Sequence, residues 1–347
     1  MERKLSYAEA IREATHQEML RDAGVCVFGL GVDDPKAVYG TTRLVDQHGP
    51  NRVFDTPLSE DALTGFAIGA SLAGMRPVNV HIRMDFLMLC MNQLINIASK
   101  YHYMYGGQAS VPIVIRSIVG KSWGQGAQHS QGLYPMLMHV PGLSVVAPTT
   151  PYDAKGLMTR SIRDDNPVMF VEHRLLHAQT GYVPEEPYEL PFGRARVLAE
   201  GTDITLVGIS YYAVECLRAR HLLQGVGISA AVIDPVTLSP LDVETIARSA
   251  RRTGHLIVVE SGWTTCGASA EIVAQVIEKT QHDARIRVNR MGFAPTVCPT
   301  TPSLEDHFYP TAATIAVAAH RAVRPSSNGW APDVARAPEL IEFRGPF

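Results

Sequence analysis

Short apolar strands alternate with helices along almost the whole chain, and this alternation limits the fold more than any other feature. The first run of apolar segments lies at 25–30, 52–54, 78–82, 111–115, 143–147 and 168–172. Helix-length segments such as 85–100 separate them, and parallel strands need crossovers of this kind. A second run lies at 204–209, 230–233, 256–260 and 286–290. The pattern predicts an α/β protein with two doubly wound parallel-sheet domains.

A proline-rich break separates the two runs. Pro184, Pro187 and Pro191 interrupt the alternation, and proline is common in linkers. We therefore expect four parts, in the order of a larger α/β domain over 1–175, a linker over 176–194, a smaller α/β domain over 195–323 and an extended tail over 324–347. With 347 residues, 46% of them apolar, the chain has enough material for two cores.

Charge and hydropathy exclude several classes of function. The formal net charge is only −3 and no basic stripe appears, which argues against nucleic-acid binding. No apolar run approaches the roughly 18 residues of a membrane span, and the N-terminus lacks a signal-peptide core. The five cysteines form no CxxC pair, which argues against a disulfide framework or a zinc site. We expect a cytoplasmic protein that acts on small molecules.

One acidic residue, Glu60, stands at the start of an unusual helix. A turn follows the strand at 52–54, and Ser59 is positioned to cap the helix. Gly65 and Gly69 leave one helix face almost without side chains, as expected where another backbone approaches closely. Glu60 is either a solvated acid favoured by the helix dipole or a buried carboxylate that needs a partner.

Three further places could carry chemistry, and each has a structural alternative. His129 lies in the glycine-rich loop 120–131 after a buried strand, and it is either a general acid/base or a loop histidine bonded to backbone. Phe86 either stacks on a planar heterocycle or packs in the core. Asp164 and Asn166 at a helix end either help to ligate a monovalent cation or form a solvated turn.

The motifs together resemble a known family. They are DTPLSE (55–60), GFAIGASLAGMRPV (65–78), GAQHSQ (126–131), IRDDNPVMFVEHR (162–174), IDPVTLSPLD (233–242) and GASAEIVAQVIEK (267–279). In this order they resemble the β subunit of thiamine-diphosphate-dependent 2-oxo acid dehydrogenases of the pyruvate, acetoin or branched-chain type. The resemblance runs from about residue 4 to 323. It implies an N-terminal pyrimidine-binding domain and a C-terminal transketolase-type domain.

The resemblance also implies the site residues. Glu60 matches the carboxylate that bonds the aminopyrimidine of thiamine diphosphate, so that the cofactor can form its C2 carbanion. Leu58 and Phe86 match cofactor-binding positions, and His129 matches a histidine that faces the substrate. A potassium site of some members corresponds to Ile113, Ser161, Asp164 and Asn166.

A partner chain follows from what the sequence lacks. There is no GDG motif followed by Asn, the pattern that holds magnesium and a diphosphate. In the family that the chain resembles, the α subunit carries this motif, which implies that most of the Mg²⁺ contacts come from the partner. The resemblance implies an α2β2 heterotetramer, and a lipoyl-bearing acyltransferase as a further partner.

Four positions depart from the family pattern. Leu30 stands where an acid is usual, Ile82 and Arg83 stand in a segment that usually reads Glu-Ile-Gln-Phe, and Val236 stands where an arginine is usual. These departures leave the substrate open. The main hypothesis is cleavage of a 2-oxo acid or an acyloin with transfer of the acyl or aldehyde unit to a lipoyl group or another acceptor. The alternatives are a split transketolase-like or acyloin-forming carboligase subunit, and a non-catalytic β-type scaffold.

Overall fold

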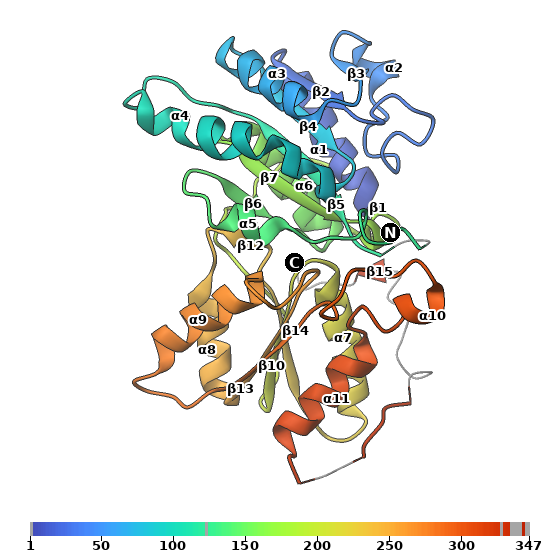
Figure 1. Ribbon diagram of the computed structural model, residues 1–347, viewed down its shortest axis with the longest axis vertical. Helices are drawn as coiled ribbons and strands as arrows, with labels where there is room; N and C mark the ends of the chain where they lie inside the picture. The colour runs from blue at the N-terminus through green and yellow to red at the C-terminus, as the bar shows by residue number, and fades with distance from the viewer. Residues whose placement is uncertain (1–2, 122–123, 327–328, 334–341, 344–347) are drawn as a thin grey trace.

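Two parallel sheets, each with helices on both faces, form the body of the molecule (Figure 1). The computed structural model describes residues 3–121, 124–326, 329–333 and 342–343. The larger sheet lies in the N-terminal half and the smaller one in the C-terminal half. The predicted α/β class is therefore confirmed, with both runs of strands forming mainly parallel sheets.

The larger sheet has seven strands in the order β12-β6-β7-β5-β4-β2-β3. They are β2 (Val25–Gly29), β3 (Val53–Asp55), β4 (Arg76–His81), β5 (Val114–Val119), β6 (Ser144–Val146), β7 (Val168–His173) and β12 (Thr237–Ser239). All pairings are parallel except that of β12 with β6. The carboxyl ends of β2, β3 and β4 therefore meet at one edge.

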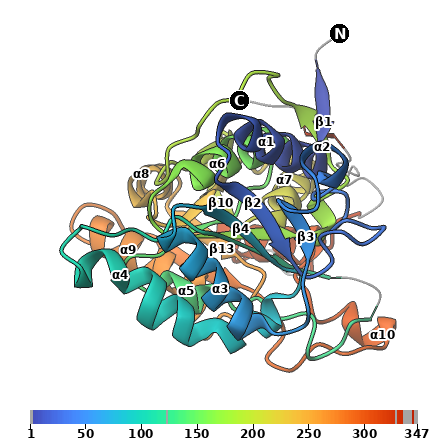
Figure 2. The ribbon, with the colours of Figure 1, turned by 90° about the horizontal axis from the view of Figure 1, so that it is seen from above.

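Helices cover the larger sheet on both faces (Figure 2). On one face lie α1 (Tyr7–Arg21) and α6 (Pro151–Arg163), whose apolar residues pack on Val27, Val78 and Val114. The other face is covered by α3 (Glu60–Leu72), η1 (Met84–Cys90), η2 (Asn92–Ala98), α4 (Ser99–Met104) and α5 (Tyr134–Met138). The short helix α2 (Val45–His48) precedes β3.

The helix expected over 85–100 differs in its winding. It begins as a 3-10 helix, continues as a π-helix and becomes an α-helix only at Ser99. The apolar pattern of this segment suits any helix that buries Leu87, Cys90 and Leu94, which all lie in one core. The sequence therefore predicts the burial but not the pitch.

The smaller sheet has five strands in the order β14-β13-β10-β11-β9. They are β9 (Arg196–Ala199), β10 (Ile204–Gly208), β11 (Ala230–Asp234), β13 (His255–Val259) and β14 (Arg287–Met291). Its helices are α7 (Tyr211–Gln224), α8 (Val243–Thr253), α9 (Ala268–Thr280), α10 (Pro302–Glu305) and α11 (Ala312–Val323). α7 and α11 share one core, whereas α8 and α9 share a core with the larger sheet.

The two halves are joined by more than the connecting chain. β12, which follows the smaller sheet's strand β11, pairs with β6 at the edge of the larger sheet. A third, small sheet contains β1 (Lys4–Ser6), β8 (Thr180–Tyr182) and β15 (Glu342–Phe343), so β8 lies within the expected linker. The expected tail covers 324–347, and its residues 327–328, 334–341 and 344–347 lie outside the described residues. The domain boundaries stay a prediction.

Candidate active site

Loops at the carboxyl ends of β2, β3 and β4 enclose a cavity of about 680 Å³. Ligands of open parallel sheets bind outside this end of the strands. The cavity brings together all four residues for which the sequence implies a cofactor-binding or catalytic role, namely Leu58, Glu60, Phe86 and His129. Their roles stay a prediction, but their convergence makes this cavity the candidate active site.

Glu60 is the first residue of α3 and is only 7% exposed. Thr64, one helical turn later, donates a hydrogen bond of 2.8 Å to the Glu60 carbonyl. Within the described part of the chain, no group donates a hydrogen bond to the Glu60 carboxylate. Glu60 is therefore a buried carboxylate that faces the cavity, and the alternative of a solvated surface acid is wrong.

The cap expected from Ser59 does not form. Ser59 occupies the N-cap position of α3, but its hydroxyl makes no capping bond and lies 3.4 Å from an oxygen of Asp61. Because no serine oxygen satisfies the first amides of the helix, its positive end is left to the carboxylates of the first turn, Glu60 and Asp61.

Phe86 and His129 contact each other across the cavity wall. Their ring centroids are 5.3 Å apart and the rings are nearly perpendicular, at 72°. Phe86 is 37% exposed, so the alternative of a core phenylalanine is wrong. The described residues make no hydrogen bond to the His129 ring, although its backbone amide lies 3.5 Å from the Gly126 carbonyl. The imidazole therefore faces the cavity without being held by backbone.

Asp85 supports the site from outside the cavity lining, and the sequence did not indicate this role. One of its oxygens accepts hydrogen bonds from the backbone amide of Gln131 at 3.1 Å and from the Gln131 side chain at 3.0 Å. Burial raises the pKa of Asp85, against the effect of these bonds and of His129. Asp85 thus ties the loop that carries His129 to η1, which carries Phe86. Only the adjacency of Asp85 to Phe86 could have suggested it.

His81 is a second wall residue without a predicted role. It ends β4, is 2% exposed, and its Nε2 lies 3.2 Å from the Thr64 hydroxyl on α3. Burial lowers the pKa of His81 to about 4, so the ring is neutral at pH 7. Its Nδ1 is buried and has no partner among the described residues. His81 therefore faces α3 and the cavity.

Three of the four departures from the family pattern meet at the cavity. Leu30, Ile82 and Arg83 all line it, because they follow β2 and β4 at their carboxyl ends. Val236 lies apart, buried at 3% exposure between β11 and β12 with a φ of 59°. The cavity wall is therefore where this chain differs most from the pattern that it resembles.

The residues matched to a potassium site lie at the opposite ends of the strands. Ser161, Asp164 and Asn166 gather at the end of α6, and the Asp164 carboxylate accepts hydrogen bonds from the amide and side chain of Asn166. The Ile113 carbonyl accepts from Val168. The guanidinium of Arg76 donates to the carbonyls of Ile162 and Asp164 at 3.1 and 3.0 Å. The Arg76 guanidinium thus binds two carbonyls at this helix end, and the potassium site stays a prediction.

The described ranges hold neither a metal-binding cluster nor a membrane-spanning helix. No three histidine, cysteine, aspartate or glutamate side chains there cluster in a way that could hold a metal ion. None of the helices there has the length and apolar character needed to cross a bilayer.

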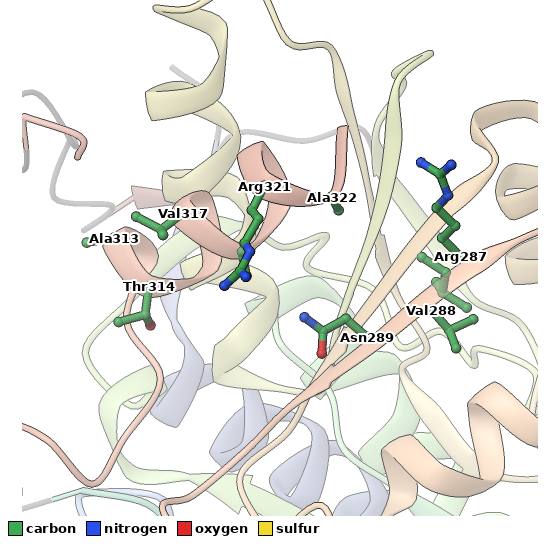
Figure 3. Close-up of a pocket in the computed structure, with 10 residues that line it drawn as sticks. Arg287, Val288, Asn289, Ala313, Thr314, Val317, Arg321 and Ala322 are labelled. Atoms are coloured by element: carbon green, nitrogen blue, oxygen red, sulfur yellow. The ribbon is translucent and has the colours of Figure 1, made fainter. Parts of the chain in front are cut away.

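A second cavity, of about 600 Å³, lies between α11 and the edge strand β14 (Figure 3). Arg287 and Asn289 on β14 and Arg321 on α11 supply its polar groups. None of the predicted site residues lines it. The candidate active site is therefore the cavity around Glu60.

Comparison with known proteins assigns both halves of the chain. Residues 3–179 match the transketolase pyrimidine-binding domain, and residues 193–315 match the transketolase C-terminal domain. One solved structure, titled a split gene transketolase and inactive beta4 tetramer, aligns with a TM-score of 0.72 at 22% identity, and covers 92% of this chain and 98% of its own. At that identity it shows the fold alone.

Curated relatives are considerably closer in sequence. The β subunit of acetoin:2,6-dichlorophenolindophenol oxidoreductase from Cupriavidus necator is 42% identical over 335 residues, which is 93% of this chain and 99% of that protein. The β subunit of the pyruvate dehydrogenase E1 component from Rickettsia felis is 42% identical over 277 residues, which is 80% of this chain and 85% of that protein. The chain therefore belongs to the family of β subunits of thiamine-diphosphate-dependent pyruvate and acetoin dehydrogenases, within the transketolase-like fold.

Proposed function

We propose that this chain supplies the pyrimidine-binding half of a thiamine diphosphate site in a heteromeric enzyme. The enzyme cleaves a 2-oxo acid or an acyloin and passes the acyl or aldehyde unit to a lipoyl group. One observation carries the proposal: the buried, unpaired carboxylate of Glu60 begins a helix and faces a cavity that Phe86 and His129 also line. The names of the relatives, which act on acetoin and pyruvate, support it.

The residues of the cavity fit the pyrimidine ring of the cofactor. Glu60 offers an acceptor in a site shielded from water, where a hydrogen bond to a ring nitrogen is strong. Phe86 offers an aromatic ring that is 37% exposed. When bound, thiamine diphosphate supplies a carbon nucleophile that attacks the carbonyl of the substrate. The task of Glu60 is to hold a proton at the ring nitrogen.

His129 is placed to exchange a proton with the substrate. Its ring is half-buried, in contact with Phe86, and makes no hydrogen bond within the described residues. The bonds between Asp85 and Gln131 hold the loop in position, so the imidazole does not need to be held directly. A histidine in such a place serves as general acid or base towards a substrate oxygen.

The other half of the site comes from a partner. We propose an α subunit that carries the GDG and Asn motif, holds the diphosphate and Mg²⁺, and assembles with this chain as α2β2. Exposed apolar groups beside the cavity fit such a partner, since Leu58 is 80% and Phe66 is 55% exposed. The open face at Gly65 and Gly69 lies on the same helix, and a methyl group added at either glycine would meet no atom within 4 Å.

Exchange of the C2 proton of thiamine diphosphate tests the role of Glu60 in the reconstituted α/β complex. We expect Glu60→Gln to slow this exchange by at least about 100-fold, since an amide cannot hold the proton as a carboxylate does. Asp61→Asn is the matched control, because Asp61 is the next residue of α3, is exposed and does not line the cavity. Assembly of both variants is checked by gel filtration.

The same complex separates the alternatives. Undiminished exchange in Glu60→Gln contradicts the assignment of Glu60. A wild-type complex that exchanges no C2 proton identifies a non-catalytic scaffold. Turnover that yields a new carbon–carbon bond and is independent of a lipoyl acceptor identifies a carboligase instead.

A further inference from the structure

Arg83 places a positive charge in the wall of the candidate active site. It lies two residues after β4 and lines the same cavity as Glu60 and His129. The resemblance implies phenylalanine at this place in many members of the family, whereas this chain has an arginine. An arginine here changes what the cavity can bind, because a guanidinium recognises anions and an aromatic ring does not.

The donors of Arg83 are mostly unused within the described residues. The guanidinium makes one hydrogen bond, from Nη1 to the carbonyl of Ile82 at 3.1 Å. Its Nε is shielded from solvent and has no partner. Leaving a buried donor unpaired costs free energy, so such a donor in a ligand cavity indicates a group that arrives with the ligand. The pair of donors formed by Nε and one terminal nitrogen matches a carboxylate.

Nearby acids do not neutralise Arg83. No carboxylate of the described residues lies within 4.0 Å of its guanidinium, although Asp34 and Asp55 line the same cavity. One oxygen of Asp55 accepts from the amides of Gly31 and Thr56, at 2.8 and 3.1 Å. Asp34 likewise accepts from amides of its own turn. These acids hold the loops, and neither of them forms an ion pair with Arg83.

A second arginine, Arg174, lies on this side of the sheet but does not line the cavity. Arg174 directly follows β7, and its guanidinium lies 5.8 Å from the ring centroid of Tyr39. Burial lowers the pKa of Arg174, Tyr39 acts to raise it, and the like charge of Arg83 lowers it. Arg83 thus has a second guanidinium near it, while Asp34, Asp55 and Glu60 also line the cavity, so recognition of an anion rests on the unpaired donors of Arg83 itself.

The chemistry of the reaction decides which anion this is. The carboxylate next to the oxo group of a 2-oxo acid loses its charge as carbon dioxide departs. A guanidinium fixed to it would stabilise the bound substrate more than the transition state. A second carboxylate at the far end of the acyl chain keeps its charge throughout and can be held without this penalty.

We infer that Arg83 recognises a second carboxylate on the acyl donor, so that the enzyme prefers a dicarboxylic 2-oxo acid. The inference rests on the proposed function for its reaction, but the binding of a carboxylate at Arg83 can be measured without turnover. Arg83 acts in it as a specificity-determining residue.

Two matched pairs of compounds test it in the assembled α/β complex. For turnover, 2-oxoglutarate and 2-oxopentanoate differ only in a terminal carboxylate or methyl group. For binding, glutarate and pentanoate differ in the same way and cannot react. We expect at least about tenfold preference for the dicarboxylate in both pairs, and loss of that preference in Arg83→Met, which keeps the apolar stem. Arg83→Lys should retain part of it.

A control removes the same charge elsewhere. Arg248 is exposed on α8 and lines none of the described cavities around the site. Arg248→Met should leave both preferences as in the wild-type complex. Calorimetric titration with inorganic phosphate shows whether another anion is held instead.

The binding experiments test the role of Arg83, whereas the turnover experiments test the proposed function. Equal affinity of wild-type complex and Arg83→Met for glutarate overturns the inference, even where 2-oxo acids are turned over. Tighter binding of phosphate than of glutarate overturns it too. A complex that cleaves no 2-oxo acid or acyloin contradicts the proposed function, whereas the glutarate titration still decides what Arg83 binds.

Discussion

Replacing Glu172 by glutamine tests how strongly a buried ion pair stabilises the centre of the larger sheet. Glu172 on β7 accepts two hydrogen bonds from Arg116 on the neighbouring strand β5, at 2.7 and 2.9 Å. The side chains are 0% and 1% exposed. Arg116 also donates to the hydroxyl of Thr41, and the ring of His177 lies 3.1 Å from Glu172. The pair thus joins two strands to the loop after β2.

The pKa of Glu172 gives the size of the effect. Burial acts to raise this pKa, but Arg116 and the hydrogen bond with His177 outweigh it and lower the value from 4.5 to about 2. That difference corresponds to about 3 kcal/mol of stability. Because the pKa is lower in the folded state, this stabilisation is complete above pH 4.5 and is lost as the pH falls towards 2. Glutamine would remove this stabilisation and leave Arg116 buried without a counter-charge, a change that costs about 3–5 kcal/mol in all.

Denaturant unfolding of the chain, followed by far-UV circular dichroism between pH 7 and pH 2.5, measures the effect. We expect Glu172→Gln to lose about 3–5 kcal/mol at pH 7, and the deficit to shrink at low pH. The double variant Arg116→Met with Glu172→Leu should lose less than the single one, because an apolar pair needs no counter-charge. Glu189→Gln is the control, since Glu189 pairs with Arg163 in a half-exposed position and should lose at most about 1 kcal/mol. A single variant as stable as this control refutes the reasoning.

Substitution of two glycines by alanine should change the stability of the chain in opposite directions. A methyl group at Gly132 would lie 1.5 Å from the carbonyl oxygen of Ser261 in the C-terminal half. Gly132→Ala should therefore lower the thermal unfolding midpoint of the chain and weaken the contact between the halves. An unchanged midpoint in thermal unfolding would contradict this. Gly69 on α3 has nothing within 4 Å of that position, so Gly69→Ala should stabilise the isolated chain by up to about 1 kcal/mol. The same change should weaken co-purification with the α subunit if that helix face is its docking surface, and equal recovery of the complex would exclude the face.

The alternation of strands and helices predicted the two sheets because each element carries its own periodicity. The strands β5 and β7 are buried on both faces and consist mainly of apolar residues. β12 and β8 have three residues each and no such pattern. They are strands only because β6 and β1 lie beside them, which a local pattern cannot indicate.

The candidate site likewise contains residues that the sequence could predict and residues that it could not. Glu60 and His129 could be found because motifs mark the ends of their strands. The contact of Asp85 with Gln131 joins residues 46 apart in the chain, and no spacing predicts it. The unpaired Nε of Arg83 is likewise a property of packing. The sequence showed that this position was unusual, whereas the structure showed that it faces the cavity.

The pairing of β12 with β6 has a consequence for synthesis of the chain on the ribosome. β6 ends at Val146 and its neighbour begins at Thr237, so about ninety residues must be added before that edge is covered. Until then the nascent larger sheet presents a row of open backbone groups at β6, where another chain could add a strand. We expect ribosome-bound fragments that stop before residue 237 to aggregate more readily than fragments that extend past residue 239. Completion of the N-terminal sheet is thus timed by translation of the C-terminal half.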